Sequence, residues 1–585
     1  MFALFDSNLP GAAGAGAWLL SQCSDEIRCS AQDDWRAALN RLEQAARNGA
    51  WVALALDYEL GHVLERKLAG RLPAEGVLLR GWIFAQGEWL DEAACDAWLA
   101  ARAGQGPHGC SAFTPAIARE DYLSRIERIR AYIAAGDCYQ VNFTFPLLGH
   151  SYGNAAGLYR QLRAAQPVRY GAYIEHAEGA ILSRSPELFL EREGDTLASL
   201  PMKGTAPRHT DPDALATSAK NRAENVMIVD LIRNDMGRLV PPGGVRVSQL
   251  CQVEGYSTVW QMISRVEASP VRASLAEIME ALFPCGSITG APKIRAMEII
   301  HELETRQTGP RGRYCGALGW IRPGGDFRFS VPIRTLLRAP DGAVKLQVGS
   351  GVVHDSVAAD EWDECLLKGQ FATRLPQDLR LIETLAYRPD LPEPLPRLAL
   401  HLARLSDSAR WLGFAFDPAS ARQLLAGVTG EAPLRLRLTL DQHGALQLEQ
   451  FAFTQGAPGA DPSVVLSPIA MDSRNPLLAH KTTARAVYDA ELTRVMGAGH
   501  FDALFVNERG ELTEGARSNL FLEIDSELLT PPLASGVLPG VLRRSLLDSG
   551  QAREAVLYPS DLHRAGATWV GNSLRGMISV RFINS

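Results

Sequence analysis

The chain has 585 residues, and at roughly 100–200 residues per domain it should fold as two or more domains. Apolar residues make up 46% and charged residues 21%, an ordinary composition for a globular protein. The formal net charge is −7 and no basic patch stands out, which argues against nucleic acid as a partner.

The cysteines and the amino-terminal residues indicate a reducing, intracellular environment. All nine cysteines lie between Cys23 and Cys365 without CxxC pairs, so they predict neither a zinc site nor a disulfide framework. Asp6 stands where a signal peptide would carry positive charge, and no run of about 20 apolar residues could span a membrane. We therefore expect a cytoplasmic protein without a membrane segment.

The first 110 residues alternate short apolar runs, as at 51–60 and 76–85, with Ala-rich stretches, which predicts mixed strands and helices. Residues 104–114, GQGPHGCSAFT, are typical of a loop. Beyond it, DYLSRIERIRAYIAAG has apolar residues at helical spacing and predicts a helix that ends near Gly136.

A short connection separates this region from a second alternation of strands and helices. Its sequence is FATRLPQDLR, over residues 371–380. We therefore predict a first domain over 1–370, with its core over 120–370, and a second domain over 381–585. There is no internal repeat and no low-complexity tract.

Seven segments of the first domain are dense in Gly, Pro and charge where a plain core would be apolar. Any one of them alone is more often a turn, a capped helix or a solvated charge run than a functional site. Their order along the chain is the informative feature. The segments are GDCYQVNFT (136–144), SRSPELFL (183–190), PMKGTAPR (201–208), KNRAENVMIVDLIRNDMGRL (220–239), FPCGSITGAPK (283–293), FSVPIRTL (329–336) and GSGVVHDSVAADEWDECLLK (349–368).

In their order and in their amino-acid sequences these segments resemble the chorismate-utilising enzymes, the family of anthranilate, aminodeoxychorismate, isochorismate and salicylate synthases. The resemblance runs from about residue 120 to 370. It implies an α+β fold of two stacked antiparallel sheets with surrounding helices. It also implies chorismate as the substrate and Mg²⁺ as a cofactor.

Three glutamates are the implied metal residues. Chorismate is a dicarboxylate, so bare glutamates facing it would repel it unless a divalent cation lay between them. By resemblance Glu224 and Glu364 are the magnesium ligands, with Glu361 close by. Glu361 and Glu364 share one face of a predicted helix. Without the resemblance, solvated helix faces are the favoured interpretation.

The resemblance also implies the residues that contact chorismate. Arg334 would bind one carboxylate, because a guanidinium fits that geometry. Gly349 and Gly351 would let backbone N–H groups approach the ligand closely, and Thr289 would be a further contact. Gln140 fills the place where isochorismate and salicylate synthases keep a water-activating lysine, which argues against water as the nucleophile.

Lys203 discriminates between members of this family. Anthranilate synthases usually have Ala at this place, whereas aminodeoxychorismate synthases have Lys. A neutral lysine could attack C2 while the C4 hydroxyl leaves, and ammonia would then add at C4 and expel the lysine. Burial or nearby positive charge should lower the pKa of Lys203 accordingly. Glu187 resembles the general acid that protonates the departing hydroxyl.

The nitrogen must be supplied to this site. The chain has no Gly-x-Cys-x-Gly segment typical of a glutamine amidotransferase, and Cys110 and Cys138 lack that context. We therefore expect ammonia to come from a separate glutamine amidotransferase subunit.

The second domain has an ordered set of segments of its own. They are HLARLSDSARWLGF (401–414), LLAHKTTARAVYDAEL (477–492), LTEGARSNLFL (512–522), GVLPGVLRRSLL (536–547) and GNSLRGMISV (571–580). Together they resemble the class IV, branched-chain aminotransferase-like group of pyridoxal-phosphate enzymes, which includes aminodeoxychorismate lyase. The resemblance implies an α+β domain that binds pyridoxal 5'-phosphate and can form a homodimer.

By this resemblance Lys481 would carry the cofactor, although by itself it could be a surface lysine of an amphipathic helix. Glu514 would pair with the pyridine nitrogen and keep it protonated. The cofactor's phosphate would be bound by Arg404, by the backbone N–H groups of Val541 and Leu542, and by Ser573.

Together the two halves would catalyse consecutive steps, from chorismate and ammonia to 4-amino-4-deoxychorismate, and then by loss of pyruvate to 4-aminobenzoate for folate biosynthesis. One alternative is an anthranilate synthase-like chain fused to a class IV amino-acid transaminase, against which Lys203 argues. Another is a regulatory pseudoenzyme that binds chorismate or an aromatic amino acid without turnover. The intact reactive residues of both halves argue against it.

Overall fold

The computed structural model is described over most of the chain. The described ranges are 1–11, 14–71, 76–256, 259–305, 308–373, 379–453 and 461–584. Residues 374–378, half of the predicted connection, lie outside them.

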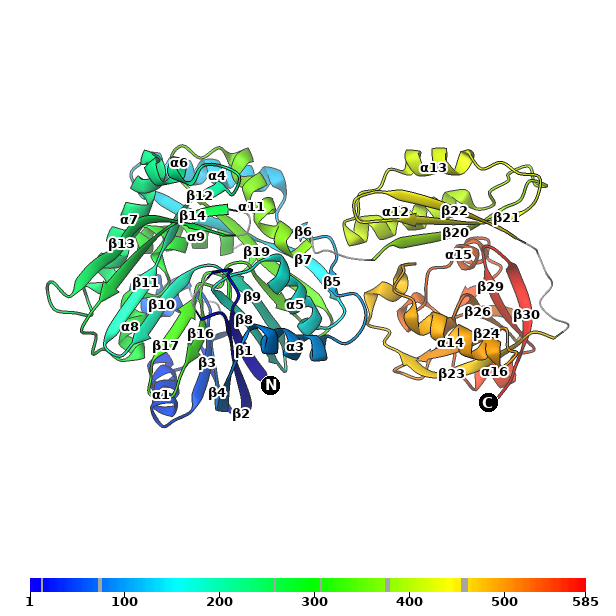
Figure 1. Cartoon of the computed structure of the whole chain (residues 1–585), viewed down its shortest axis with the longest axis horizontal. Coiled ribbons are helices and arrows are strands. Elements are labelled where there is room, and N and C mark those ends of the chain that lie inside the picture. The colour runs from blue at the N-terminus through cyan, green and yellow to red at the C-terminus, as the bar shows by residue number, and fades with distance from the viewer. Residues whose placement is uncertain are drawn as a thin grey trace. The chain divides into compact units, whose positions relative to one another are not determined.

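The chain forms two compact units (Figure 1). The first consists of Met1–Gly104 and Phe113–Pro376, and the second of Gln105–Ala112 and Gln377–Ser585. The segment 105–112, predicted only as a loop, thus groups with the carboxy-terminal half. Within that unit the N–H of Ala112 donates to the carbonyl of Trp411 at 2.8 Å.

The first unit is built on antiparallel strands. They are β1 (Phe2–Ser7), β2 (Gly16–Ser30), β3 (Trp51–Leu56), β4 (Val77–Leu90), β6 (Thr114–Pro115), β7 (Gln140–Tyr152), β8 (Tyr170–His176), β9 (Gly179–Ser185), β10 (Leu188–Glu193), β11 (Thr196–Leu200), β12 (Met202–Pro207), β13 (Val245–Gly255), β14 (Val259–Ala268), β15 (Gly290–Ala291), β16 (Ala317–Ile321), β17 (Phe327–Ser330), β18 (Thr335–Arg338) and β19 (Ala343–Val352). The short β5 (Gly109–Cys110) lies in the segment that groups with the second unit.

Helices surround these strands (Figure 1). They are α1 (Trp35–Arg47), α2 (Leu60–Leu64), α3 (Glu92–Ala103), α4 (Arg119–Ala134), α5 (Ala155–Ala165), α6 (Pro212–Thr217), α7 (Ala219–Met236), α8 (Leu275–Leu282), α9 (Lys293–Ile300) and α11 (Ala358–Thr373), with the 3₁₀ turn η2 (Gly286–Ile288). Side chains fix where they begin: the oxygen of Ser218 accepts the N–H of Asn221 at the start of α7. Ser274 and Glu277 form a capping box at α8.

Two halves of the strand network pack face to face. One half runs β7–β19–β18–β9–β8–β1 and the other β2–β4–β3–β16–β17–β10–β11–β14, joined by the β1–β2 pair. A core cluster contains Ile174 and Ile181 from the first half with Ala53, Trp82 and Leu318 from the second. The predicted α+β fold with stacked antiparallel sheets is thereby confirmed.

The second unit has two sheets. Strands β20 (Leu381–Tyr387), β21 (Leu434–Leu440) and β22 (Leu446–Ala452) form an antiparallel sheet covered by α12 (Leu398–Leu412) and α13 (Pro418–Ala426) (Figure 1). The larger sheet contains β23 (Ser463–Met471), β24 (Asp502–Asn507), β25 (Leu512–Gly515), β26 (Asn519–Ile524), β27 (Glu527–Thr530), β28 (Arg553–Glu554), β29 (Ala567–Asn572) and β30 (Gly576–Phe582). Its helices are α14 (Ala486–Gly497), α15 (Val541–Asp548) and α16 (Asp561–Arg564). This unit, too, is of α+β type.

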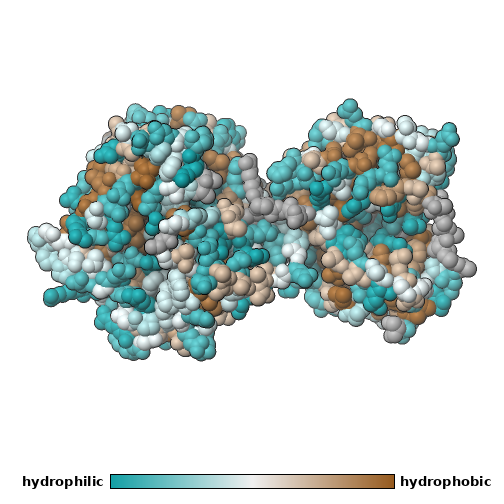
Figure 2. Space-filling model, in the orientation of Figure 1, coloured by the Kyte–Doolittle hydropathy of each residue, from teal (hydrophilic) through white to brown (hydrophobic). Residues whose placement is uncertain are grey.

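The surface mixes polar and apolar side chains over both units on the face seen in Figure 2. Among the described residues, no helix is both long enough and apolar enough to cross a membrane.

Candidate active sites

Lys203 lies on β12, and its amine faces a small space between strands. A Cβ atom built on Gly351 of β19 would lie 3.5 Å from Nζ of Lys203 and 3.1 Å from Nε2 of Gln140. Nε2 of Gln140 is buried and has no hydrogen-bond partner among the described residues. The structure therefore brings Lys203, Gln140 and Gly351 together, and the missing side chain of Gly351 keeps this space open.

Two carboxylates and a second amine surround Lys203. Burial lowers the pKa of Lys203, while Glu187 and Glu224 oppose that shift and Lys368 adds to it. A lowered pKa increases the fraction of neutral amine, which is the form that can act as a nucleophile. Lys368 was not singled out from the sequence.

Glu187 is a buried carboxyl group with an unusual proton affinity. Burial raises its pKa to about 7, although Ser287 and Lys203 lower it. The hydroxyl of Ser287 donates to Oε1 of Glu187 at 2.6 Å, and Sγ of Cys285 lies 3.1 Å from the same hydroxyl. A carboxyl group that titrates near neutrality can hold and release a proton. The sequence missed Ser287, whose only signal is its place within SITGAPK.

Arg334 lies between β17 and β18 in a left-handed backbone conformation, with φ of 50°. Burial lowers its pKa, and only the phenols of Tyr256 and Tyr314 oppose that shift. No carboxylate of the described residues forms an ion pair with it. A desolvated guanidinium without a counter-charge is suited to an anionic ligand.

Thr289 and Gly349 have clear structural partners. The hydroxyl of Thr289 donates to the carbonyl of Cys285 at 2.8 Å, inside the turn formed by η2. A Cβ atom on Gly349 would lie 2.6 Å from the carbonyl oxygen of Phe143, so close pairing of β19 with β7 requires glycine here. Their contacts with substrate remain predictions.

The predicted metal residues come from two helices. Glu224 lies on α7, whereas Glu361 and Glu364 lie on α11. Glu364 is more than half exposed and pairs with Lys368 at 2.6 Å, and Nζ of Lys368 also donates to the carbonyl of Gly349 at 2.8 Å. In the described part of the chain, no three His, Cys, Asp or Glu side chains are arranged to hold a metal ion. Glu224 and Lys368, the ion-pair partner of Glu364, both lie within electrostatic reach of Lys203.

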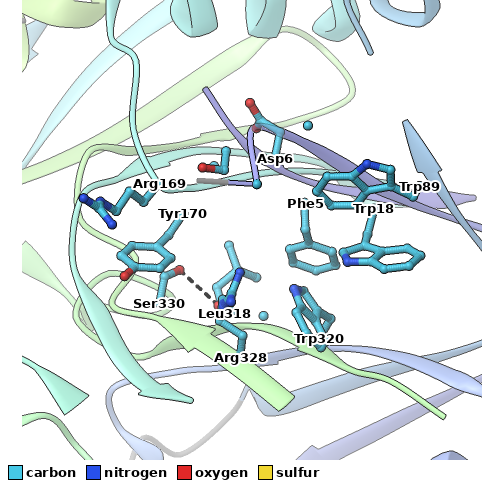
Figure 3. Close-up of a pocket in the computed structure, with 15 residues that line it drawn as sticks. Phe5, Asp6, Trp18, Trp89, Arg169, Tyr170, Leu318, Trp320, Arg328 and Ser330 are labelled. Atoms are coloured by element: carbon cyan, nitrogen blue, oxygen red, sulfur yellow. Dashed lines mark hydrogen bonds between the residues drawn. The ribbon is translucent and has the colours of Figure 1, made fainter. Parts of the chain in front are cut away.

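A separate cavity lies between the two halves of the strand network (Figure 3). Trp18, Trp89 and Trp320 lie on one side of it, and Arg169 and Tyr170 on the other. None of the residues predicted to act on chorismate lines this cavity. The predicted chemistry therefore belongs to the space around Lys203.

In the second unit, Lys481 follows the 3₁₀ turn η4 (Pro476–Ala479) in an extended segment, not on an amphipathic helix. Its carbonyl accepts the N–H of Ile382 at 2.8 Å, which attaches the segment to β20. Burial, together with the positive charges of Arg404 and Arg485, lowers the pKa of Lys481 to about 8. The amine is thus poised to lose its proton near neutral pH.

Glu514 ends β25 and is buried. Burial raises its pKa to about 7, although Tyr488, the N–H of Leu538 and the positive charges of Arg485 and Lys481 lower it. The hydroxyl of Tyr488 donates to Oε1 at 3.0 Å, and Nδ2 of Asn519 and the N–H of Leu538 donate to Oε2 at 3.3 and 3.2 Å. Lys481 lies within electrostatic reach of this carboxylate. The structure therefore holds Glu514 in one orientation beside Lys481.

Arg404 is part of a buried network on α12. Its Nε and one terminal nitrogen donate to both oxygens of Glu383, at 2.8 and 2.7 Å. Although burial alone would raise it, Arg404 and His401 lower the pKa of Glu383 to about 2. Nε2 of His401 lies 2.8 Å from Oγ of Ser573. Sequence reasoning missed Glu383, whose signal is an acidic residue within the apolar strand LIETLAY.

The remaining nitrogen of Arg404 donates to the carbonyl of Pro539 at 3.2 Å, next to the start of α15. No side chain caps that helix, so the N–H groups at Val541 and Leu542 are not used by a cap. A guanidinium beside an uncapped helix start fits a phosphate group. Lys481 and Glu514 lie near the same residues, so this donor set fits pyridoxal phosphate.

Two family models match the chain. The model of chorismate binding enzymes matches residues 12–374, and that of class IV amino-transferases matches residues 380–583. The solved structure of anthranilate synthase component I from Streptococcus pneumoniae aligns with a TM-score of 0.54 at 24% identity, over 63% of this chain and 94% of that one. This last likeness shows the fold alone.

Similar curated proteins carry two different names. Aminodeoxychorismate synthase component 1 of Klebsiella aerogenes is 43% identical over 263 residues, covering 43% of this chain and 57% of that protein. Its Escherichia coli namesake is 40% identical over 42% of this chain and 55% of its own length. Anthranilate synthase component 1 of Streptomyces coelicolor is 41% identical, with coverages of 46% and 54%. The chain thus spans little more than half the length of these relatives.

Proposed function

Because the chain belongs to the family of chorismate binding enzymes, we propose that its first unit converts chorismate and ammonia to 4-amino-4-deoxychorismate. The second unit, which matches class IV amino-transferases, then releases pyruvate from that product and leaves 4-aminobenzoate. The observation that carries the proposal is Lys203, a desolvated amine beside a carboxyl group whose pKa is raised to about 7.

In the first unit Arg334 binds one carboxylate of chorismate. The neutral amine of Lys203 forms a bond to C2, both ring double bonds shift (C1=C2 to C1=C6, and C5=C6 to C4=C5), and the C4 hydroxyl leaves as water with the proton of Glu187. Ammonia then bonds to C4, both double bonds shift back, the C2–nitrogen bond to Lys203 breaks, and the proton that the new amino group loses returns to the carboxylate of Glu187. Glu224 and Glu364 would hold a magnesium ion, which would reduce repulsion of the second carboxylate.

In the second unit Lys481 has two roles. It would hold pyridoxal phosphate, which when bound supplies an electron sink for breaking bonds to the carbon that bears the amino group. The released amine of Lys481 takes the C4 proton of aminodeoxychorismate, after which pyruvate leaves from C3 and the ring becomes aromatic. Arg404 and the N–H groups of Val541 and Leu542 would hold the phosphate. Glu514 would pair with the pyridine nitrogen and keep it protonated.

The anthranilate synthase-like alternative is favoured by one observation, the similarity to relatives of that name, such as the one from Streptomyces coelicolor. It would require ammonia to enter at C2, without a lysine nucleophile there. Nζ of Lys203 would lie 3.5 Å from a Cβ atom built on Gly351, so the amine borders the space that this glycine leaves open. A lysine at this place supports the aminodeoxychorismate reaction instead.

We also propose that the chain works with a separate glutamine amidotransferase subunit in cytoplasmic folate biosynthesis. The relatives named component 1 support a second component that supplies ammonia. Pairing of two chains through the second unit is a further part of this proposal.

The direct test incubates the chain with chorismate, Mg²⁺, ammonium ions and pyridoxal phosphate, and identifies the products by mass spectrometry. We expect 4-aminobenzoate and pyruvate in equal amounts. Anthranilate with pyruvate would favour the alternative, and unchanged chorismate would indicate a protein that binds without turnover.

A further inference from the structure

Arg397 has an unusual backbone conformation and no acidic partner. It immediately precedes α12 with a left-handed φ of 59°, a conformation that is costly for a residue other than glycine. Among the described residues, its nitrogens make two long contacts, 3.4 Å to Oγ and 3.5 Å to the carbonyl of Ser573. Burial is the one cause that shifts its pKa, which is lowered, so no described carboxylate neutralises it.

Arg404 on the same helix provides the contrast. Both oxygens of Glu383 accept hydrogen bonds from Arg404, so its charge is balanced. Arg397, which is half-buried, shares three features with Arg334 of the first unit: a positive φ, a pKa lowered by burial and no ion pair among the described residues. Each unit therefore has one arginine, Arg334 or Arg397, that combines a costly backbone conformation with an unbalanced charge.

The hydroxyl of Ser573 cannot be the donor to an anion at this place. Nδ1 of His401 lies 2.6 Å from the ionised Glu383 and therefore carries the proton, which leaves Nε2 as an acceptor. Nε2 lies 2.8 Å from Oγ of Ser573, so the hydroxyl proton points to His401. The guanidinium of Arg397 is then the group in this cluster that has N–H donors to spare.

Lys481 lies within electrostatic reach of this cluster, which consists of Arg397, Ser573, His401 and Glu383. Glu383 and His401 both act on Lys481 electrostatically, and His401 contacts the residue that Arg397 contacts. Arg397 and Arg404 are seven residues apart, roughly 10 Å along a helix, so their guanidinium groups can reach different anionic groups. The guanidinium of Arg404 lies next to the start of α15, where a phosphate fits.

We infer that Arg397 binds a carboxylate of the substrate in the second unit, held in position by Ser573. This inference rests on the proposed function of that unit, because aminodeoxychorismate carries two carboxylates and needs a cationic partner. Arg397 would act on binding and orientation, and would move no proton. The cofactor's phosphate is the competing source of the anion, and the experiment separates the two.

The test compares Arg397→Gln with the unchanged chain in two measurements. One is KM and kcat for pyruvate release from supplied 4-amino-4-deoxychorismate, and the other is the Kd of the cofactor-free protein for pyridoxal phosphate. Loss of charged hydrogen bonds should raise KM roughly 10- to 100-fold. The Kd for pyridoxal phosphate should stay within about twofold of the unchanged value.

Two variants serve as controls. Arg410→Gln, an exposed arginine on the same helix that pairs with Asp407, should leave both measurements unchanged. Arg397→Lys keeps the charge without the planar fork and should give an intermediate KM, and it replaces Arg397→Gln if that variant does not fold.

A weaker affinity for pyridoxal phosphate with an unchanged KM would overturn the inference and assign Arg397 to the phosphate. Unchanged values in both measurements would overturn it as well. If the unchanged chain releases no pyruvate, the proposed function itself is wrong and the inference falls with it, so the two failures are distinguishable.

Discussion

Lys203 and Glu187 are oppositely charged groups whose pKa values burial moves toward each other. The pKa of Glu187 is raised to about 7 and that of Lys203 is lowered. Both shifts favour the uncharged forms, the neutral amine of Lys203 and the protonated carboxyl group of Glu187, relative to the same groups in water. Their protonation states are coupled, because each contributes to the shift of the other.

Glu187 should give the synthase reaction a pH dependence of defined sign. The acid must be protonated, so the rate should fall as pH rises through about 7. Because the hydrogen bond from Ser287 lowers this pKa, Ser287→Ala should move the midpoint upward by about one pH unit. Pre-steady-state rates of chorismate consumption between pH 5.5 and 9, a range of roughly three units around the pKa, provide the measurement. A midpoint that Ser287→Ala leaves unchanged would exclude Glu187 as the titrating acid.

Lys481 should be the attachment point of pyridoxal phosphate. Borohydride treatment of the loaded protein should fix the cofactor on the peptide that contains Lys481, because its lowered pKa of about 8 makes the amine reactive. Lys481→Ala should accumulate 4-amino-4-deoxychorismate from chorismate. Peptide mass spectrometry checks the label, and labelling of another lysine would refute the assignment.

At the scale of elements, the local sequence pattern predicted individual helices and strands but not which strands pair. The helix expected to end near Gly136 is confirmed as α4, and φ of Gly136 is 82°. The apolar run at 51–60 contains β3, and the run at 76–85 forms the first part of β4. The pairing of β7 with β19 joins residues about 200 positions apart in sequence. Such a pairing depends on the whole sheet, so local periodicity could not predict it.

The pairing of β19 with β7 places Gly351 close to the side chain of Gln140. A methyl group there would lie 3.1 Å from Nε2 of Gln140 and 3.5 Å from Nζ of Lys203. Gly351→Ala should therefore raise KM for chorismate by about tenfold or more, with a change in stability of about 1 kcal/mol or less. Gly70→Ala, where the added methyl group meets open space, is the matched control. Equal KM values for both variants would show that substrate does not occupy this space.

At the scale of the whole molecule, the residues with strong motifs were the predictable part of each site. Lys203, Glu187 and Lys481 were predicted because their segments occur in a characteristic order. Ser287 and Glu383 were missed because their partners lie 100 and 21 residues away, and only the fold brings them together. The arrangement of the metal residues could not be predicted either, since it depends on how α7 and α11 approach each other.

The supply of nitrogen is also a property of the whole chain. Ammonium salts should support formation of 4-amino-4-deoxychorismate by this chain alone, because ammonia itself is the nucleophile at C4. Glutamine should not replace them until a glutamine amidotransferase subunit is added. Product formation at matched nitrogen concentrations checks this, and activity of the homogeneous chain with glutamine would reveal an amidotransferase site that the sequence reasoning missed.

The central claim is that Lys203 is the covalent nucleophile, and Lys203→Ala tests it most directly. The variant should still bind chorismate, because Arg334, Glu224 and Glu364 are unchanged. Its rate of 4-amino-4-deoxychorismate formation should fall by orders of magnitude, and any residual reaction should place nitrogen at C2. Release of pyruvate from supplied 4-amino-4-deoxychorismate should be unaffected. Measured on one preparation, loss of the first rate with retention of the second supports this mechanism, whereas near-normal synthase turnover would contradict it.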